Sequence, residues 1–574
     1  PYTVSPNTQH CTKMLSRLLQ ENLPANLTTM NAFYTDIPEY EENIRPFKSR
    51  MWEVPDEELW VYGAIDTDVV ARLVPDLHGR VVAHGVDWVY NNLSIPLIQC
   101  AQRMEQRGIA IDLDYFDRLC LYFGEELEKA CEELDQLVGR HVDKPTYYET
   151  LQNLLFVEYK LPLTHKPVDS AIKGDNRCGK CQRDKPCSPR HASTNGDELA
   201  ALNERHPHAI LPIVIAIKKL DKFKGTYLDG GRGGFRRHIR SDGRIHGRWN
   251  PGDAETGRYT SQDPNLMNPP KGVEVDSDKY NIHTKDAIRD MFTCRPGNVL
   301  MNADWSQLEI WVLAYTTQDE TLLNLLTSGE DVHVYVARKL CELGVSNVFP
   351  NTSRQPELDN YEWAQVHGDL RGKAKTFVFG LSYQLTVEGA ALRLGCTVDE
   401  AQLLFNAFLN DIFPSLPGFF ANVRQEMLRT NGVRNMFKRM RHFDEIPILQ
   451  ALGFSNDLEA CIRQGVNFPI QAGGHDLHSL AAIKHEFDPV LVSRCEVVME
   501  MHDSLAMEVK AATALETAWI VKNSWEDTAK NTIMPNGEKL GWEIPVDVEW
   551  GRTFGTPDWK LTARGQVIDL RKVT

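Results

Sequence analysis

Three apolar segments that lie next to two aspartates constrain the fold of this chain most. VLMNAD (299–304) ends at Asp304, and a helix pattern, SQLEIWVLAYTT (306–317), follows it. CEVVMEM (495–501) and SLAMEV (504–509) flank His502 and Asp503 in the pattern of a β-hairpin. The sequence between these segments is mostly helical. We therefore predict a mixed α/β (α+β) fold.

Asp304 and Asp503 are candidate metal ligands. A carboxylate at the end of an apolar strand is costly unless it binds a cation. Two carboxylates that arrive from strand ends match the oxygen ligands that Mg²⁺ prefers, so we expect two Mg²⁺ ions here. Each aspartate taken alone is also compatible with an ordinary turn or helix cap.

Four side chains at four-residue spacing indicate a ligand-binding helix. Arg371, Lys375, Phe379 and Tyr383 follow one another at this interval, and each step drifts by only about 40° around a helix. Two cations followed by two aromatic rings fit a ligand with a polyphosphate at one end and a flat base at the other. The alternative is an amphipathic helix with Phe379 in the core.

Charge is distributed unevenly along the chain. The 574 residues carry a formal net charge of −16, whereas residues 218–248 contain ten Lys/Arg against three acids, a local net of 10 − 3 = +7. This stretch favours contact with a polyanion such as nucleic acid, and a solvated basic face is the alternative. A composition of 42% hydrophobic and 25% charged residues excludes disordered and collagen-like chains.

No targeting or membrane signal is visible in the sequence. There is no long uninterrupted apolar run, and the first residues lack a basic segment followed by an apolar one. Most of the twelve cysteines lie singly, which suits reduced thiols. We expect an intracellular, cytoplasmic protein without a membrane partner, in the host cytoplasm if the source is viral.

Three motifs resemble those of the family A DNA polymerases, the bacterial DNA polymerase I and phage replicase group. They are DWSQLEIWVLAY from Asp304, RGKAKTFVFGLSYQ from Arg371 and MEMHDSLAMEV around Asp503. TGRYTSQDPNLMNPP, EDVHVYVA, RQGVNFPIQAGG and IPLIQCAQRMEQRGIAID extend the resemblance from about residue 94 to 559. It implies a phage-type replicative DNA polymerase with a right-hand fold of palm, fingers and thumb.

The resemblance also implies a role for each site residue. Asp304 and Asp503 would hold two Mg²⁺ ions, and Lys375 would protonate the leaving group. The residues that would bind the incoming deoxynucleoside triphosphate are Arg371, Lys375, Phe379, Tyr383, His333, Glu309 and Gln307, with Glu309 excluding a ribose 2′-hydroxyl. The residues that would contact primer-template DNA are Arg258, Asn265, Arg463, Asn467, Gln471 and His502.

The same resemblance divides the chain. It implies a partial 3′-5′ exonuclease-like region at 1–90, a helix that leads into the polymerase half at 91–140, and a thumb at 141–235 with a Cys-rich insertion at 166–195. The palm would comprise 236–315 and 446–574, the latter with a C-terminal tail, and the fingers would comprise 316–445.

Some positions depart from the family pattern. Ser504 stands where a glutamate is usual, Gln384 where a glycine is usual, and Trp305 where a tyrosine is usual. His-Asp-Ser also occurs in single-subunit RNA polymerases, which are one alternative, although Glu309 argues against them. A catalytically inactive polymerase-like DNA-binding subunit and a zinc-bearing scaffold are the others.

The N-terminal segment resembles only part of an exonuclease. YGAID (62–66) is similar to the third motif of a proofreading 3′-5′ exonuclease, and about sixty residues precede it. Asp56-Glu57-Glu58 lies too close to Tyr62 to supply another motif and is more typical of a helix start. We expect an incomplete exonuclease, so proofreading would be absent from this chain and a separate exonuclease subunit would be a partner.

A polar insertion contains a candidate structural zinc site. Cys178, Cys181, Cys187 and His191 follow the spacing C-x2-C-x5-C-x3-H, which suits tetrahedral Zn²⁺. Unliganded cysteines in a loop are the alternative. Because some phage members of the family carry a processivity-factor site in the thumb, a processivity factor is a further expected partner.

Overall fold

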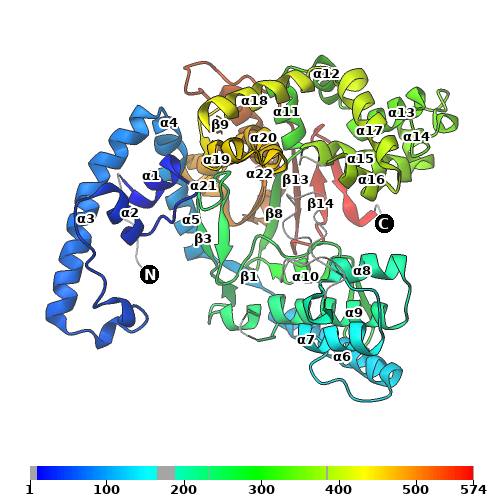
Figure 1. The fold of residues 1–574 in the computed structure, drawn as a ribbon, viewed down its shortest axis with the longest axis horizontal. Coiled ribbons are helices and arrows are strands. Elements are labelled where there is room, and N and C mark those ends of the chain that lie inside the picture. The colour runs from blue at the N-terminus through cyan, green and yellow to red at the C-terminus, as the bar shows by residue number, and fades with distance from the viewer. Residues whose placement is uncertain (1–9, 165–187, 232, 383–385, 573–574) are drawn as a thin grey trace.

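The computed structural model describes residues 10–164, 188–231, 233–382 and 386–572. A six-stranded antiparallel sheet lies at its centre (Figure 1). The strand order is β11 (Cys495–Met501), β12 (Ser504–Lys510), β8 (Asn298–Trp305), β13 (Val546–Gly551), β14 (Trp559–Leu561) and β15 (Val567–Asp569). The predicted strand and hairpin are therefore confirmed, and the sheet brings them together as neighbours.

Long helices cover this sheet. They are α5 (Ile95–Arg107), which packs on β11, α20 (Ser455–Phe487), which also contacts β11, and α22 (Ala514–Asn531), which packs on β8, β12 and β13. The fully buried Trp525 of α22 lies against Trp305, with ring centroids 5.1 Å apart. α11 (Leu308–Thr317) packs on α20, where a Cβ at Gly474 would lie 3.3 Å from Leu308 Cγ. The glycine therefore lets these two helices approach closely.

One helical lobe follows α11 in the sequence and extends across the top of Figure 1 to its upper right. Its helices are α12 (Glu320–Ser328), α13 (Val332–Leu343), α14 (Asn360–Val366), α15 (Gly368–Ser382), α16 (Val387–Leu394), α17 (Val398–Asn406) and α18 (Leu416–Thr430). The fully buried Phe377 of α15 meets Phe405 and Phe408 edge to face, at 5.1 and 5.4 Å. Aromatic packing of this kind fixes α15 in the lobe.

The return to the sheet runs through short elements. They are β9 (Gly432–Arg434), β10 (Met440–His442), α19 (Ile446–Leu452) and, after α20, α21 (Pro489–Arg494).

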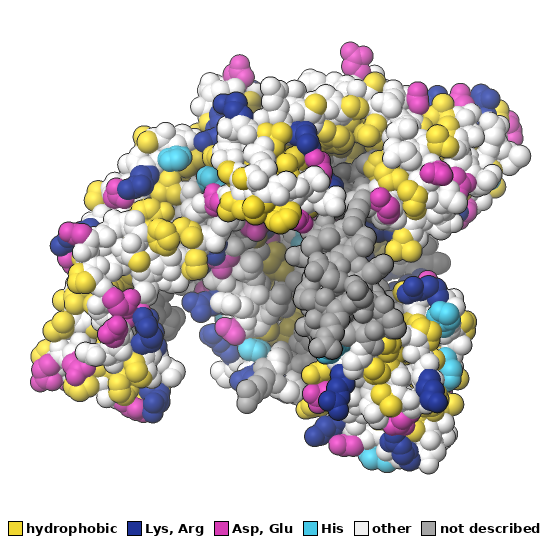
Figure 2. Space-filling model, in the orientation of Figure 1, with side chains coloured by type: hydrophobic (Ala, Val, Ile, Leu, Met, Phe, Trp, Pro, Cys, Tyr) yellow, Lys and Arg dark blue, Asp and Glu magenta, His cyan; other side chains and the backbone are white. Residues whose placement is uncertain are grey.

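A second helical lobe lies at the lower right of Figure 1. It contains α6 (Leu113–Val138), α7 (Tyr148–Gln152), α8 (Gly196–Arg205) and α9 (Ile210–Lys222), and it has a core of its own that includes Leu134, Leu199 and Val214. Figure 2 shows Lys and Arg side chains on the surface of this lobe.

Small sheets connect this lobe to the centre. β1 (Ile109–Ile111) pairs with β2 (Arg244–Ile245) and β7 (Phe292–Thr293). The hairpins β3 (Arg248–Asn250) with β4 (Thr260–Gln262) and β5 (Val275–Ser277) with β6 (Ile282–Thr284) precede α10 (Ala287–Asp290).

The N-terminal elements form an arm at the left of Figure 1. They are α1 (Thr12–Leu19), α2 (Leu27–Tyr34), α3 (Asp56–Ala83) and α4 (Asp87–Val89). α3 buries Val69, Leu73, Leu77 and Val81 at four-residue spacing, and α1 and α2 pack against it. α3 begins at Asp56, so the interpretation of residues 56–58 as a helix start is confirmed. Acidic side chains at this end stabilise the helix because its N-terminus is the positive end of the helix dipole.

Candidate active site

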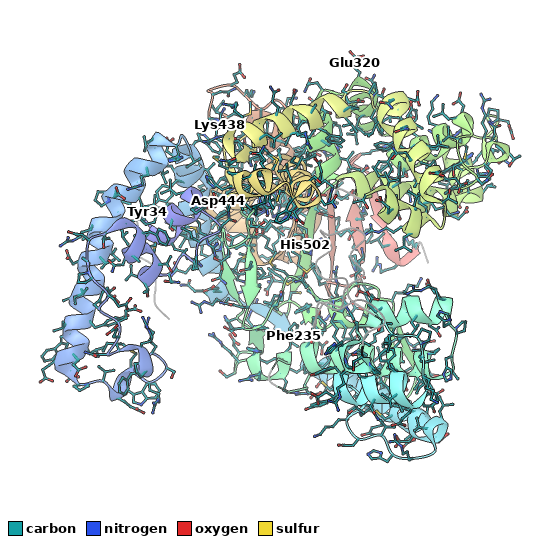
Figure 3. All side chains as sticks on the ribbon, in the orientation of Figure 1. Tyr34, Phe235, Glu320, Lys438, Asp444 and His502 are labelled. Atoms are coloured by element: carbon teal, nitrogen blue, oxygen red, sulfur yellow. The ribbon has the colours of Figure 1, made fainter. Side chains whose placement is uncertain are left out.

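Asp304 and Asp503 line the same cavity. Asp304 lies near the end of β8, directly opposite Ser504, the first residue of β12. Asp503 occupies the two-residue turn between β11 and β12, next to His502. The side chains of Asp304, His502 and Asp503 line one cavity of about 420 Å³. Figure 3 shows His502 near the middle of the molecule. The strand pairing thus brings together two carboxylates from distant parts of the sequence.

The cavity concentrates negative charge around Asp304. Its carboxylate is accessible from the cavity, yet the surrounding protein and the charges of Asp503, Asp547 and Glu549 raise its pKa to about 7. A nearby cation would offset this repulsion and favour the ionised form. Carboxylate oxygens are also the ligands of hard divalent ions, so the residues present fit Mg²⁺.

Arg258 joins two predicted site residues. Its Nη2 donates to Glu309 Oε1 at 3.1 Å and to Asp503 Oδ1 at 3.5 Å. Glu309 lies in the first turn of α11 and is 8% exposed. The arginine therefore fixes the position of a nearly buried carboxylate beside the cavity.

Two site residues have left-handed backbone conformations. Gln307 (φ +57°) precedes α11 and His502 (φ +57°) begins the β11–β12 turn. Non-glycine residues rarely adopt positive φ, and such strain is frequent at functional sites. Gln307 and Ser306 line a second cavity of about 540 Å³ between α11, the end of α12 and the loop after β14.

The predicted phosphate-binding residues meet at the start of α13. Asp331 caps this helix, accepts from the backbone N–H groups of His333 and Val334, and forms an ion pair with Arg371 at 2.6 Å. Burial lowers the pKa of His333, the charge of Asp331 raises it, and the charge of Arg371 lowers it. The net result is a pKa of about 4, so this side chain is neutral at pH 7. The exposed Lys375 follows one turn after Arg371 on α15.

The predicted DNA-binding residues of α20 form one polar stripe. Arg463, Asn467 and Gln471 recur every four residues and are partly exposed, whereas most of their neighbours are buried. Asn265 is exposed in the loop after β4, and its side chain accepts from the backbone N–H of Met267. Polar groups at this spacing can follow one groove of a duplex.

Some predicted residues lie outside the described part of the structure. α15 ends at Ser382, and Tyr383 follows it outside the described residues; Phe379 is on α15, but its side chain is not described. Cys178, Cys181 and Cys187 also lie outside the described residues, whereas His191 ends a short 3₁₀ helix, Pro189–His191. Among the described residues, no three His, Cys, Asp or Glu side chains are arranged to hold a metal ion.

The segment YGAID (62–66), which resembles an exonuclease motif, lies on α3. Tyr40 donates from its hydroxyl to Asp66 Oδ1 at 2.6 Å, and the rings of Tyr40 and Tyr62 are 5.9 Å apart. Burial and the carboxylate of Asp66 raise the pKa of Tyr62 to about 12. Asp66 is therefore held by a tyrosine within the N-terminal arm.

Sequence reasoning missed several residues of the main cavity. Asp547 and Glu549 on β13 lie opposite Asp304 and Asn302 of β8. Lys271, Asp286, Arg289 and Lys560 also line this cavity. The sequence PVDVEWG (545–551) contains a signal for these two acids, because they are two residues apart in an alternating pattern. Residues at that spacing lie on the same face of a strand.

No helix in the described ranges has the length and apolar character needed to span a bilayer.

Comparisons with known proteins find a matching family profile and similar sequences. The family profile described as DNA polymerase family A matches residues 114–556. The chain is 28% identical over 478 residues to the thermostable DNA polymerase I of Thermus thermophilus, which is 83% of this chain and 49% of that protein. It is 27% identical over 504 residues to the DNA polymerase I of Chloroflexus aurantiacus, 87% of this chain and 47% of that protein. The chain thus spans about half the length of these curated relatives.

A solved structure shares the fold. It is the POL domain of Pol1 from M. smegmatis, in complex with DNA primer-template and dNTP. The TM-score is 0.72 at 23% identity, over 95% of this chain and 82% of that one.

Proposed function

The chain belongs to DNA polymerase family A, and on that premise we propose that it is a template-directed, primer-dependent DNA polymerase. The observation that carries the proposal is the meeting of Asp304 and Asp503 in one cavity, delivered by the end of β8 and the β11–β12 turn. Such an enzyme would add deoxynucleotides to the 3′-hydroxyl of a primer.

Asp304 and Asp503 are the residues that would hold two Mg²⁺ ions. When bound, Mg²⁺ supplies neutralisation of phosphate charge and activation of the primer oxygen. The protein's own part is electrostatic and positional, because phosphoryl transfer needs aligned groups rather than a covalent protein nucleophile.

The residues near α13 and α15 would bind the triphosphate. Arg371, pre-oriented by Asp331, would present a guanidinium to the phosphates, and neutral His333 would donate a hydrogen bond to them. Lys375 would give a proton to the leaving pyrophosphate. Gln307, Phe379 and Tyr383 would complete the nucleotide site.

Glu309 would select the sugar. Its carboxylate is nearly buried and held by Arg258, so it cannot turn away without breaking that hydrogen bond. A ribose 2′-hydroxyl would meet this side chain, which supports a DNA polymerase over the single-subunit RNA polymerase alternative.

Primer-template DNA would lie across the sheet between the two helical lobes. Arg258, Asn265, Arg463, Asn467, Gln471 and His502 would contact it, largely without regard to base sequence. We assign the sheet to the palm, the lobe of α12–α18 to the fingers and the lobe of α6–α9 to the thumb (Figure 1).

We further propose a phage-type replicative enzyme that acts in the cytoplasm. The polar Cys-rich insertion at 166–195 supports this, since it lies in the sequence between α7 and α8 of the lobe assigned to the thumb and its spacing suits a zinc knuckle or a docking site for a processivity factor. Asp66, engaged by Tyr40, supports the proposal that proofreading by this chain needs a separate exonuclease.

Primer extension tests the proposed function. The full chain is given a primer-template, Mg²⁺ and one deoxynucleotide at a time, and the template base is varied. We expect the complementary nucleotide alone to be added, and addition to stop with a chelator. DNA binding without extension under any of these conditions would instead identify an inactive polymerase-like subunit.

A further inference from the structure

The last two strands of the sheet follow the residues that the family profile matches. The match ends at residue 556, and β14 and β15 come after it. β14 pairs with β13, so that Lys560 lies directly opposite Glu549. Because Glu549 in turn lies opposite Asn302 of β8, three strands place their side chains in one row beside the cavity.

Lys560 contacts two acids of β13. Its Nζ donates to Glu549 Oε1 at 2.9 Å and lies 3.7 Å from Asp547 Oδ2. The other oxygen of Asp547 accepts from the backbone N–H of Ala563 at 2.6 Å. β14 and the loop after it therefore engage both oxygens of Asp547.

The position of these acids creates a problem for a metal site. Asp547 is the cross-strand neighbour of Asp304, and like charges in that arrangement repel. Five carboxylates line the cavity, namely Asp286, Asp304, Asp503, Asp547 and Glu549. Carboxylates that are free to turn would compete to coordinate any divalent ion bound there.

Lys560 is a cavity cation that forms ion pairs with both of these β13 acids. Lys271 and Arg289 also line the cavity, but Arg289 donates both Nε and Nη2 to the carbonyl of Pro269 at 3.1 Å. Lys560 thus forms ion pairs with two carboxylates that are candidate ligands of a divalent ion.

We propose that Lys560 is a positioning residue that holds Asp547 and Glu549 away from the divalent ions bound by Asp304 and Asp503. This inference rests on the proposed function, because it concerns the same ions. It implies that β14, which follows the residues matched by the family profile, limits metal binding to the two aspartates from β8 and the β11–β12 turn.

The proposal is tested by titrating the full chain, without DNA, with Mn²⁺. The EPR signal of free Mn²⁺ measures how much of the ion is bound. Lys560→Met keeps the apolar stem and removes the charge, so we expect Mn²⁺ to bind about tenfold more tightly as the β13 acids become ligands. Lys560→Arg should stay within about threefold of wild type. The triple variant Lys560→Met, Asp547→Asn, Glu549→Gln should return to the wild-type affinity.

An unchanged Mn²⁺ affinity of Lys560→Met would overturn the proposal, even if its primer extension fell. Thermal melting establishes that the variant is folded. If Lys560→Met does not fold, the double variant Asp547→Asn, Glu549→Gln decides the question. An unchanged Mn²⁺ affinity of this variant supports the proposal. A fall in Mn²⁺ affinity of about tenfold or more would show that these acids are ligands and would overturn the proposal. Wild-type primer extension reports separately on the proposed function.

Discussion

Arg258 Nη2 lies 3.1 Å from Glu309 Oε1, although 51 residues separate the two in the sequence. The same nitrogen lies 3.5 Å from Asp503 Oδ1. One arginine thus links the residue assigned to sugar selection with a residue assigned to metal binding. Substitutions at these positions should have separable effects on substrate choice and on chemistry.

Glu309→Ala should admit ribonucleotides. Removal of the carboxylate opens the space that a 2′-hydroxyl would occupy, so the preference for deoxynucleotides should fall by about 100-fold. The measurement is the ratio of kcat/KM for the two sugars with the same base. Glu320→Ala, at the exposed start of α12, is the matched control and should keep the wild-type ratio. Equal use of both sugars by wild type would favour the RNA polymerase alternative.

Arg371→Ala should weaken binding of the incoming nucleotide. A charge-assisted hydrogen bond to phosphate contributes about 1.5–3 kcal/mol, so KM for the deoxynucleotide should rise about 10- to 100-fold. Steady-state incorporation of a single nucleotide measures this. Arg393→Ala, on an exposed part of α16 in the same lobe, should leave KM unchanged. An equal effect of the two substitutions would show that Arg371 does not touch the nucleotide.

Glu508→Gln should reduce stability at neutral pH. The buried Glu508 on β12 pairs with Arg244 and also with Arg295 at 2.6 Å, and removing one partner of a buried ion pair costs about 3 kcal/mol. These arginines lower the pKa of Glu508. The contribution is therefore full above the ordinary value of about 4.5 and is lost as the pH falls through the lowered pKa.

Thermal unfolding at several pH values tests this. Wild type should melt above Glu508→Gln at pH 7, and the difference should shrink as the pH falls below 4.5. A difference that stays constant with pH would mean that the ion pair does not produce it.

The cysteine insertion should bind zinc. Elemental analysis of chelator-washed protein should find about one Zn²⁺ per chain, and Cys181→Ser should lose it. Cys396→Ser, in the half-buried loop before α17, is the control and should retain the metal. Metal-free wild type with freely reactive thiols would leave the insertion as a loop without a metal site.

Local patterns in the sequence predicted the elements that carry the site. The acid at the end of an apolar run predicted that Asp304 lies at the end of a strand, which is β8. The two polar residues between β-like runs predicted that Asp503 lies in a turn, which joins β11 and β12. Both predictions succeed because strand and turn signals are local in the sequence. The four-residue spacing also placed Arg371 and Lys375 on α15. The roles of these residues stay predictions.

Other parts of the site depend on contacts that local patterns do not encode. Asp547 reaches Asp304 only through strand pairing across 243 residues, from 547 − 304. Lys560 joins that row through a strand of only three residues, which is too short to show a periodic pattern. Arg258 was predicted to contact DNA, and its bonds to Glu309 and Asp503 arise from tertiary packing.

The most direct test of the account is single-turnover nucleotide addition by Asp304→Asn and Asp503→Asn, with binding of primer-template measured on the same samples. Each variant should bind DNA within about threefold of wild type and add nucleotide at least about 1,000-fold more slowly, because electrostatic stabilisation of the transition state is lost. Asp56→Asn, at the exposed start of α3, should behave as wild type. Nucleotide addition by Asp304→Asn at the wild-type rate would contradict the assignment of this cavity as the polymerase active site.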